Sequence, residues 1–307
     1  MTPLRQALRD YLRIRRQLGY RLAEDGRLLE TFVDFLERAG SATITTELAL
    51  AWAKLPVGAR THRWRQRLGI VRRFARYLAT IDPDAEVPSK DLLPASCVRV
   101  APYIYTDAEI AALMAEARAL APLLRAATYE TLIGLMAASG LRIGEALGLD
   151  RQDVDLRDGS LHVRARQTKQ REVPLHDSAT NALRKYARLR DQHWPDPKTH
   201  AFFVSRGGLR LTRSAVKDTF PKLIRRAGLE GRGQRVRPRP HDLRHTFAVR
   251  TLLDLHRAGA EVQRELPRLS TYLGHVDPSA TYWYLQAVPE LLQLVGRRLD
   301  GVFGEAP

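Results

Sequence analysis

The sequence has almost no cysteine. Cys97 is the only one among 307 residues, which excludes a disulfide framework and a metal cluster built on cysteines. We interpret Cys97 as a small buried or linker residue rather than a reactive thiol. No apolar run approaches the roughly 18 residues of a membrane-spanning helix, and the N-terminus lacks the apolar core of a signal peptide. These absences predict a cytoplasmic protein with no membrane partner.

Acidic residues and lysine are both scarce beside arginine. Lys and Arg total 50 against 34 Asp and Glu, so the net charge is +16. Lysine occurs only at positions 54, 90, 169, 185, 198, 217 and 222. Such an excess of positive charge favours a polyanionic partner, most often nucleic acid, and guanidinium groups suit bidentate phosphate contact. A basic surface that is merely solvated is the alternative.

Residues 1–80 show the apolar periodicity of a helical domain, with helices at about 4–18, 23–38, after Thr45, and 59–80. The last helix carries seven arginines with no acidic residue between them: Arg60, Arg63, Arg65, Arg67, Arg72, Arg73 and Arg76. Like charges at helical spacing cost stability, so a phosphate-binding face is favoured over a solvated one. We expect DNA contacts from Arg60, Arg63, Arg67, Arg72 and Arg76. The proline-containing stretch 81–102 is typical of an interdomain linker.

From residue 103 the pattern predicts further helices and one small sheet. Thr106 has the sequence of a helix N-cap with a capping box, and an apolar helix should cover about 125–139. Alternating apolar residues around Asp158-Gly159 predict a hairpin, with more strands at 172–175 and 202–204. Helices should follow over about 178–192, from Thr212 and from His241. The expected fold is mainly α with a small antiparallel β-sheet.

Residues that can act on a phosphodiester gather between His241 and Tyr284. The helix that starts at His241 is indicated by the spacing of Leu243, Phe247, Leu252 and Leu255. His241 and Arg244 lie at positions i and i+3 of this helix, so both can face one anion. A second helix should begin near Pro278 and carry Tyr284. An arginine can hold a phosphate, histidines can move protons, and a tyrosine can attack.

These motifs resemble the tyrosine recombinase (phage integrase) family. The resemblance rests on His241-x-x-Arg244, on Leu273-Gly274-His275, and on Tyr284 nine residues after His275. Residues 138–149 (Ala-Ser-Gly-Leu-Arg-Ile-Gly-Glu-Ala-Leu-Gly-Leu) are similar to the family's first-arginine box and lie about a hundred residues earlier. The resemblance is clear from 138 to 284. It implies an N-terminal helical DNA-clamp domain (1–80), a linker (81–102) and a catalytic domain (103–307).

The resemblance also implies a role for each site residue. Arg142 and Arg244 would hold one phosphate and neutralise the charge that builds up on it, and Glu145 would orient Arg142. His241 and His275 would hydrogen-bond the phosphate or take the nucleophile's proton. Tyr284 would be the nucleophile. Tyr272 and Tyr282 are nearby, and Tyr282, the alternative nucleophile, is interpreted together with Trp283 as a core aromatic.

The general acid is ambiguous between two residues. The family places a lysine in the hairpin turn, where it protonates the leaving 5′ oxygen. Counted back from Val173 without gaps, that position falls on Arg166, whereas a shorter turn would put Lys169 there. An ammonium can give up a proton and a guanidinium effectively cannot. We therefore expect Lys169 to be the acid and Arg166 to contact DNA.

A metal site on the same helix is an alternative interpretation. His241 and His245 are four residues apart, the spacing of a zinc-binding helix. However, Asp242 follows His241 where that motif has a glutamate, and no third ligand is evident. We therefore predict neither a metal nor any other cofactor.

The implied reaction is site-specific DNA strand exchange through a 3′-phosphotyrosine intermediate, in an integrase or transposase of a mobile element. The partner would be a duplex recombination site in the nucleoid. Four protomers would form the synapse, with a monomer as an option for the free protein and with helper recombinases or accessory proteins as further partners. A tail helix over 288–299 would dock on a neighbouring protomer or fold back on its own domain. The alternatives are type IB topoisomerase-like relaxation and a non-catalytic DNA-binding accessory protein.

Overall fold

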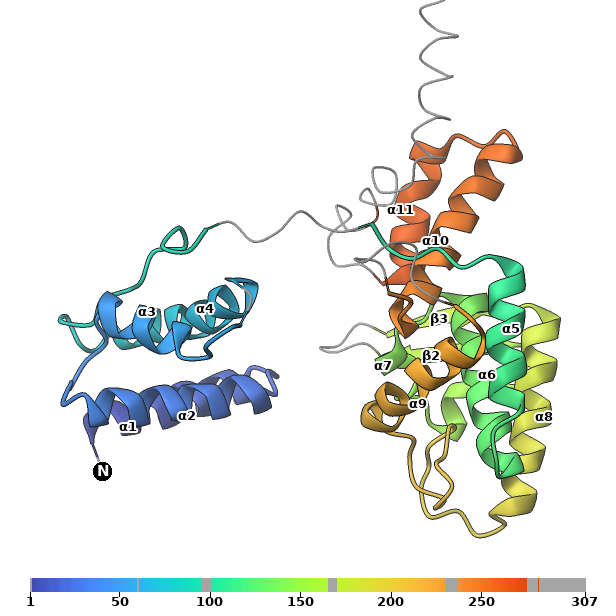
Figure 1. Cartoon of the computed structure of the whole chain (residues 1–307), viewed down its shortest axis with the longest axis horizontal. Coiled ribbons are helices and arrows are strands. Elements are labelled where there is room, and N and C mark those ends of the chain that lie inside the picture. The colour runs from blue at the N-terminus through green and yellow to red at the C-terminus, as the bar shows by residue number, and fades with distance from the viewer. Residues whose placement is uncertain are drawn as a thin grey trace, which may run out of the picture. The chain divides into compact units, whose positions relative to one another are not determined.

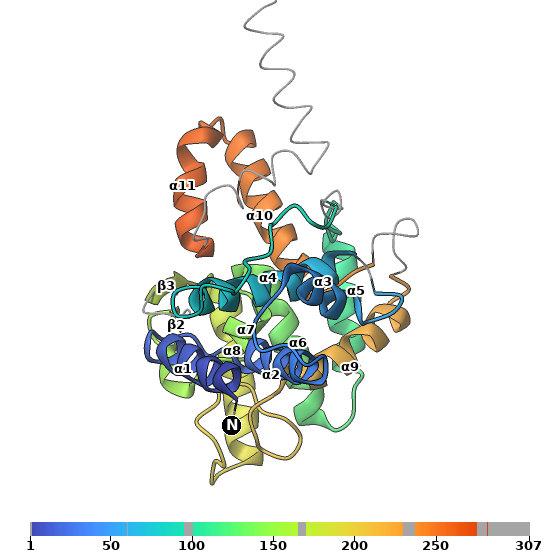
Figure 2. The same ribbon diagram turned by 90° about the vertical axis from the view of Figure 1, so that its left-hand side faces the viewer.

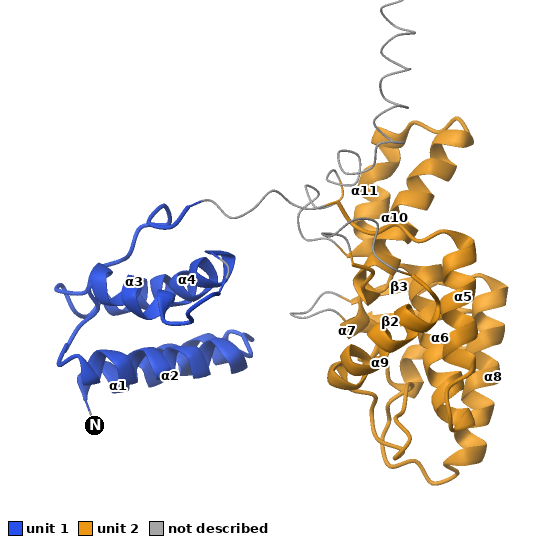
Figure 3. Ribbon diagram, viewed as in Figure 1, with its two compact units in different colours: residues 1–99 blue, residues 100–307 orange. Residues whose placement is uncertain are grey.

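The computed structural model describes residues 2–59, 61–94, 101–164, 170–229, 237–274 and Thr281. The chain divides into two compact units, Met1–Arg99 and Val100–Pro307 (Figure 1; Figure 3). Each unit has a hydrophobic core of its own. The described residues are mainly helical, and a small antiparallel sheet lies in the second unit. This confirms the predicted fold class. None of the described helices is long and apolar enough to cross a membrane.

Unit 1 is built from four helices close to the expected ranges: α1 (Pro3–Gln17), α2 (Ala23–Arg38), α3 (Thr46–Lys54) and α4 (Thr61–Leu78). Their apolar faces meet in one core in which Phe32 and Trp52 are fully buried, with ring centroids 5.1 Å apart. Thr45 caps α3, because its hydroxyl accepts the backbone N–H of Leu48. The periodicity of the sequence was sufficient to locate these helices.

The first part of the expected linker packs on unit 1 instead. Ala85 and Leu93 are buried in its core, and the N–H of Glu86 donates to the carbonyl oxygen of Ile44 at 2.8 Å. The Arg65 guanidinium donates to the carbonyl oxygens of Leu93 and Pro94. Prolines remove backbone donors but keep acceptors, so an irregular segment can be fixed by arginines from a neighbouring helix. Proline content alone did not reveal this.

Helix α6 is the centre of unit 2. It runs Leu123–Ser139 and packs against α5 (Asp107–Arg118), α8 (Asp177–His193) and α10 (Pro240–Arg257), as Figure 1 shows. The capping box predicted at the start of α5 is present, since Thr106 and Glu109 exchange hydrogen bonds. The apolar character of α6 therefore reflects burial on several sides.

The sheet lies beside these helices with strand order β1-β2-β3. Its strands are β1 (Val154–Asp155), β2 (Ser160–Arg164) and β3 (Gln170–Pro174), all antiparallel, and Leu161 pairs with Val173. Short helices precede it: α7 (Ile143–Ala146) and the 3-10 turn η1 (Arg151–Asp153). The strand predicted at 202–204 is wrong, because only the single bridges Asp150–Ala201 and Val204–Arg210 form there.

The remaining described helices are α9 (Arg213–Arg226) and α11 (Val262–Leu273). Figure 2 shows α11 beside α10, and the two share a small core with Ala248, Leu252 and Leu269. Sequence patterns did not indicate α11. The helix expected from Pro278 and the tail helix 288–299 lie outside the described residues, apart from Thr281.

The chain enters unit 2 along α10. The N–H of Tyr105 donates to the Thr246 hydroxyl at 2.9 Å, and the Tyr105 hydroxyl donates to the carbonyl of Arg239 at 3.2 Å. Arg250 donates to the carbonyl of Tyr105 at 2.8 Å and pairs with Asp107. Residues 105–107 are therefore fastened to α10 before the chain continues into α5.

Candidate active site

The first arginine is presented by a helix break. Helix α6 ends at Gly140, whose φ of +63° is a left-handed conformation that suits glycine. The chain then turns, and the carboxylate of Glu145 accepts the backbone N–H of Arg142 at 2.9 Å, which closes the first turn of α7. The glycine in the sequence motif thus ends one helix, and the glutamate starts the next.

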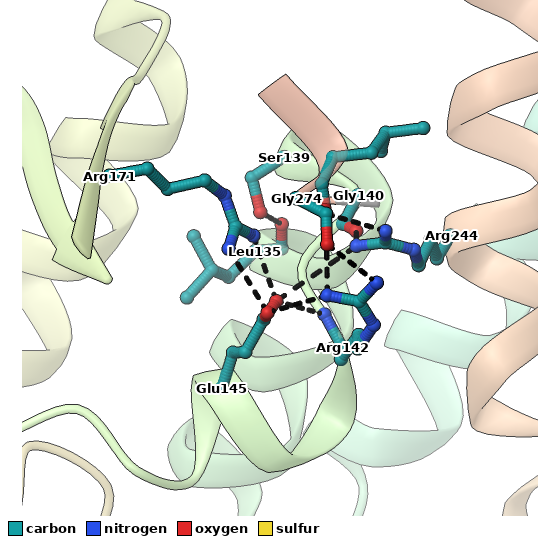
Figure 4. Close-up of polar contacts among 9 residues, drawn as sticks. Leu135, Ser139, Gly140, Arg142, Glu145, Arg171, Arg244 and Gly274 are labelled. Carbon is teal, nitrogen blue, oxygen red and sulfur yellow. Dashed lines mark hydrogen bonds and ion pairs between the residues drawn. The ribbon is translucent and has the colours of Figure 1, made fainter. Parts of the chain in front are cut away.

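The second arginine comes from the start of α10. Pro240 occupies the first turn, where its missing N–H costs nothing, and Arg244 follows about one turn later. The Arg244 side chain is 1% exposed. Its two terminal nitrogens donate to the carbonyl oxygens of Gly140 at 2.8 Å and Leu273 at 2.6 Å. Arg244 thereby joins the end of α6 to the end of α11 (Figure 4).

Arg142 and Arg244 converge on the C-terminus of α11. Arg142 donates to the carbonyl oxygen of Gly274 at 3.0 Å and more weakly to that of Leu273 at 3.4 Å. The Leu273 oxygen is therefore within reach of both guanidiniums. This geometry is what joint binding of a single oxyanion requires. Their contact with a DNA phosphate stays a prediction.

Glu145 is the anion that these cations share. Its side chain is 9% exposed and accepts hydrogen bonds from Arg142 at 2.8 Å and from both terminal nitrogens of Arg171, at 3.1 and 2.9 Å (Figure 4). Arg244 lies 3.9 Å away. Burial alone would raise the pKa of Glu145, but the hydrogen bonds from Arg171 and from the Arg142 backbone lower it to about 2. The observed bonds are those expected of a residue that orients Arg142.

Arg171 was missed as a member of this site. Its side chain is only 13% exposed. Side chains alternate along a strand, so the inward position of Val173 puts Arg171 on the same face two residues earlier. That alternation was the signal available in the sequence.

His241 lies in the first turn of α10, with its ring edge-to-face against that of His245 at a centroid distance of 4.6 Å. The residue is exposed. Crowding by protein atoms nevertheless disfavours the charged ring and, together with the positive charges of Arg244 and Arg142, lowers the pKa of His241 to about 4. The sequence pointed to a pKa near neutrality. In the absence of DNA, His241 is instead neutral at pH 7 and can accept a proton.

The same histidine pair was the alternative metal site. Among the described residues, no group of three or more His, Cys, Asp or Glu side chains could hold a metal ion. Asp242, between the two histidines, is fully buried. Its carboxylate accepts hydrogen bonds from the backbone N–H and from the guanidinium of Arg239. It therefore caps α10.

The arginines of α4 divide into two groups. Arg67 donates to the carbonyl of Trp52 at 2.9 Å and lies 3.7 Å over its ring. Arg72 donates to the carbonyls of Pro88 and Ser89, both at 2.7 Å. Arg65 and Arg73 also have partners within unit 1. Part of the arginine cluster, including Arg67 and Arg72, therefore stabilises unit 1.

Two arginines of α4 remain open to a ligand. Arg63 and Arg76 are exposed, and their guanidinium groups have no hydrogen-bond partner within the described residues. They are the stronger DNA-binding candidates on this helix. Arg60 lies outside the part of the chain that the structure describes.

The other predicted site residues, Arg166, Lys169, His275 and Tyr284, also lie outside the described residues, so their roles stay predictions. Two described residues are close to these segments in the chain. Arg171 follows Lys169 by two residues, Gly274 precedes His275, and both lie against the Arg142–Glu145 pair.

Comparison with known proteins identifies the family. Residues 104–290 match the family model described as "Phage integrase family". The chain is 42% identical over 307 residues to a protein of Sinorhizobium fredii named as an integrase/recombinase, y4rB, with 98% of each chain covered. It is 36% identical over 155 residues to the tyrosine recombinase XerC of Pseudomonas aeruginosa, and the aligned residues cover 50% of this chain and 46% of XerC.

Solved structures share the fold. The Tn1549 transposon integrase, in complex with transposon right end DNA, superposes with a TM-score of 0.67 at 18% identity and covers 98% of this chain and 100% of that one. A lambda integrase dimer bound to a core site gives a TM-score of 0.60 at 18% identity, over 92% and 76% of the two chains. Taken with the matched family model and the full-length relative, the convergent arginines belong to a site-specific DNA recombinase, and the chain is a member of the phage integrase family of tyrosine recombinases.

Proposed function

We propose that this recombinase exchanges DNA strands through a 3′-phosphotyrosine intermediate in which Tyr284 is the nucleophile. The observation that carries the proposal is the convergence of Arg142 and Arg244 on one oxygen atom, with the neutral ring of His241 on the same helix as Arg244. The shared bond to the Leu273 oxygen shows that both guanidiniums can reach one acceptor, and a non-bridging phosphate oxygen that reached both would receive two charge-assisted hydrogen bonds. Such a site is organised before the substrate arrives.

The chemistry follows from these charges. A phenol with a pKa near 10 becomes a usable nucleophile when nearby cations favour its anion. His241, neutral at pH 7, can take the phenolic proton, while Arg142 and Arg244 stabilise the charge on the pentavalent phosphorus. Lys169 would donate a proton to the departing 5′ oxygen. The 5′ hydroxyl of another strand then attacks the phosphotyrosine bond, so a phosphodiester replaces a phosphodiester without ATP.

The biological setting is a mobile element, with duplex DNA held by both units. Relatives named as integrase/recombinase and the fold shared with a transposon integrase in complex with transposon DNA support this setting. Exposed Arg63 and Arg76 of α4 would contact the phosphate backbone and add a salt-dependent, sequence-independent component to binding. Exchange between two duplexes needs two cleavages on each, so the synapse would hold four protomers.

A nicked duplex carrying the flanking DNA of the gene tests the nucleophile, because the short cleaved strand diffuses away and traps the covalent complex. Wild type, Tyr284→Phe and Tyr272→Phe are incubated with a chelator present and run on a denaturing protein gel. Tyr272 is a matched control: it is half-buried, its ring stacks on Phe247 with centroids 5.5 Å apart, and burial raises its pKa. Wild type and Tyr272→Phe should form the covalent band, and Tyr284→Phe should not.

Each other outcome identifies a different error. A band that persists in Tyr284→Phe refutes the choice of nucleophile. Tight, salt-dependent DNA binding without a band from wild type favours an accessory DNA-binding protein. Relaxation of supercoiled plasmids that lack any site, without recombinant products, favours a topoisomerase-like activity.

A further inference from the structure

Arg171 makes the most complete ion pair of the site, although it is not one of the residues that the proposed reaction uses. Its two terminal nitrogens donate in parallel to the two oxygens of Glu145, at 3.1 and 2.9 Å. The side chains are 13% and 9% exposed, so the pair is largely withdrawn from water. The Arg171 Nε is buried and has no hydrogen-bond partner among the described residues. A planar fork suits this geometry, and a lysine could not reproduce it.

Arg171 also lies against the segment that leads to His275. A side-chain carbon added at Gly274 would come within 2.7 Å of an Arg171 terminal nitrogen, so the absence of a side chain there lets the guanidinium approach. The carbonyl oxygen of Gly274 accepts from Arg142 at 3.0 Å. Three segments therefore meet around Arg171: the start of β3, the turn that carries Arg142, and the end of α11.

The charges explain why such a residue is needed. Glu145 accepts hydrogen bonds from Arg142 as well as from Arg171, and Arg244 is 3.9 Å away. Without Arg171, a buried carboxylate would have Arg142 as its main partner, and that ion pair would remove one of the two positive charges offered to a phosphate. Arg171 compensates the carboxylate, so Glu145 can hold Arg142 in place while Arg142 and Arg244 together keep a positive excess.

We propose that Arg171 is a positioning residue for strand cleavage, which fixes and neutralises Glu145 so that Arg142 remains available to the DNA phosphate. This rests on the proposed function, because the phosphate is the ligand assumed for Arg142. The register of the β2–β3 pair also links Arg171 to the candidate acid. Arg171 pairs with Val163, one residue pair from the end of the β2–β3 ladder that leads to residues 165–169, and it follows Lys169 by two residues, so the same ion pair anchors the strand that follows the candidate acid.

Hydrogen exchange tests the positioning step without requiring activity. The backbone N–H of Arg142 donates to Glu145, so its exchange rate reports whether the carboxylate is held. In Arg171→Gln, exchange in a peptide covering residues 140–146 should become at least about tenfold faster. Arg164→Gln is the matched control, because Arg164 is on the same hairpin but pairs with Asp153. Unchanged exchange in Arg171→Gln would overturn the proposal.

Single-turnover cleavage of the nicked duplex tests the catalytic consequence. Arg171→Gln should cleave at least about tenfold more slowly than wild type, with DNA affinity changed less than about twofold, and Arg171→Lys should be intermediate because it keeps the charge but loses the fork. Once Glu145→Gln has removed the carboxylate, adding Arg171→Gln should slow cleavage little further. Rate losses that multiply in the double variant would refute the route through Glu145.

The two experiments separate two kinds of failure. If wild type forms no covalent complex while Arg171→Gln still accelerates exchange at residues 140–146, the proposed reaction is wrong but the positioning of Arg142 stands. If wild type cleaves and Arg171→Gln cleaves equally well, the reaction stands and Arg171 has no positioning role.

Discussion

Replacing Gly140 by alanine should damage the protein more than its position at the end of a helix suggests. A left-handed backbone costs a residue with a side chain about 1–2 kcal/mol. At Gly140 the new methyl group would also lie 2.5 Å from a ring carbon of Phe247 and 3.1 Å from a methyl of Leu273. Overpacking of this kind adds about 1–3 kcal/mol. We therefore expect a total loss of about 2–5 kcal/mol in the free energy of unfolding.

Gly259→Ala is the control for this prediction. Gly259 follows α10 in the same unit, has a φ of +76°, and has no atom within 4 Å of the position of an added methyl. It should lose only the backbone component, about 1–2 kcal/mol. Urea unfolding followed by circular dichroism, with both variants in the full chain, measures the difference. Equal losses in the two variants would refute the reasoning about Phe247 and Leu273.

The same substitution should reduce activity by moving an acceptor of Arg244. The carbonyl oxygen of Gly140 receives one of the two hydrogen bonds that hold the Arg244 guanidinium. Phe247→Leu replaces the ring by a smaller side chain. In the double variant with Gly140→Ala it should restore part of the stability and of the cleavage rate, because the effects of substitutions at contacting residues are not additive. If the double variant recovers neither stability nor cleavage rate, the loss in Gly140→Ala comes from the backbone conformation alone.

Three further predictions follow from named contacts. The folded-state pKa of His241 is about 4, below its ordinary 6.5. Between these two pH values the unfolded state binds more protons than the folded state, so the free energy of unfolding should fall as the pH falls from 6.5 to 4. The urea midpoint measures this, and His241→Gln should make it depend less on pH. Arg63→Gln and Arg76→Gln should each weaken DNA binding and reduce the slope of log affinity against log salt by about 1, whereas Arg73→Gln, whose side chain pairs with Asp25, should change the slope less. Arg244→Lys should cost about 1–3 kcal/mol of unfolding free energy and slow cleavage, because one ammonium cannot serve the two carbonyls now bonded to separate nitrogens.

Sequence reasoning located the helices well because they carry strong apolar periodicity. The range expected for α4, 59–80, compares with Thr61–Leu78, and the cap predicted at Thr106 is present. It failed where long-range contacts decide the structure. Residues 85–94 read as a linker because their backbone partners, such as Arg65, are distant in sequence. The strand at 202–204 was predicted from apolar content alone and forms only isolated bridges.

For the site, motif spacing selected Arg142, Glu145 and Arg244, which the structure brings together. It could not reveal that the α11 carbonyls serve as a common acceptor, because backbone acceptors have no sequence signature. It also passed over Arg171, since a strand arginine is usually exposed and only the three-dimensional pairing shows its partner. The pKa of His241 depends on the same packing of charges and was likewise out of reach.

The attachment of residues 105–107 to α10 has a mechanical consequence. Tyr105 is bonded to Arg239, Thr246 and Arg250, which bracket the turn of α10 that carries His241 and Arg244. Tension that reaches unit 2 through residue 101 is therefore carried by α10 as well as by α5, which Tyr103 contacts through Glu109 at 2.6 Å. A pull on the chain upstream would therefore load the helix that holds the second arginine, so mechanical strain and chemistry share one element.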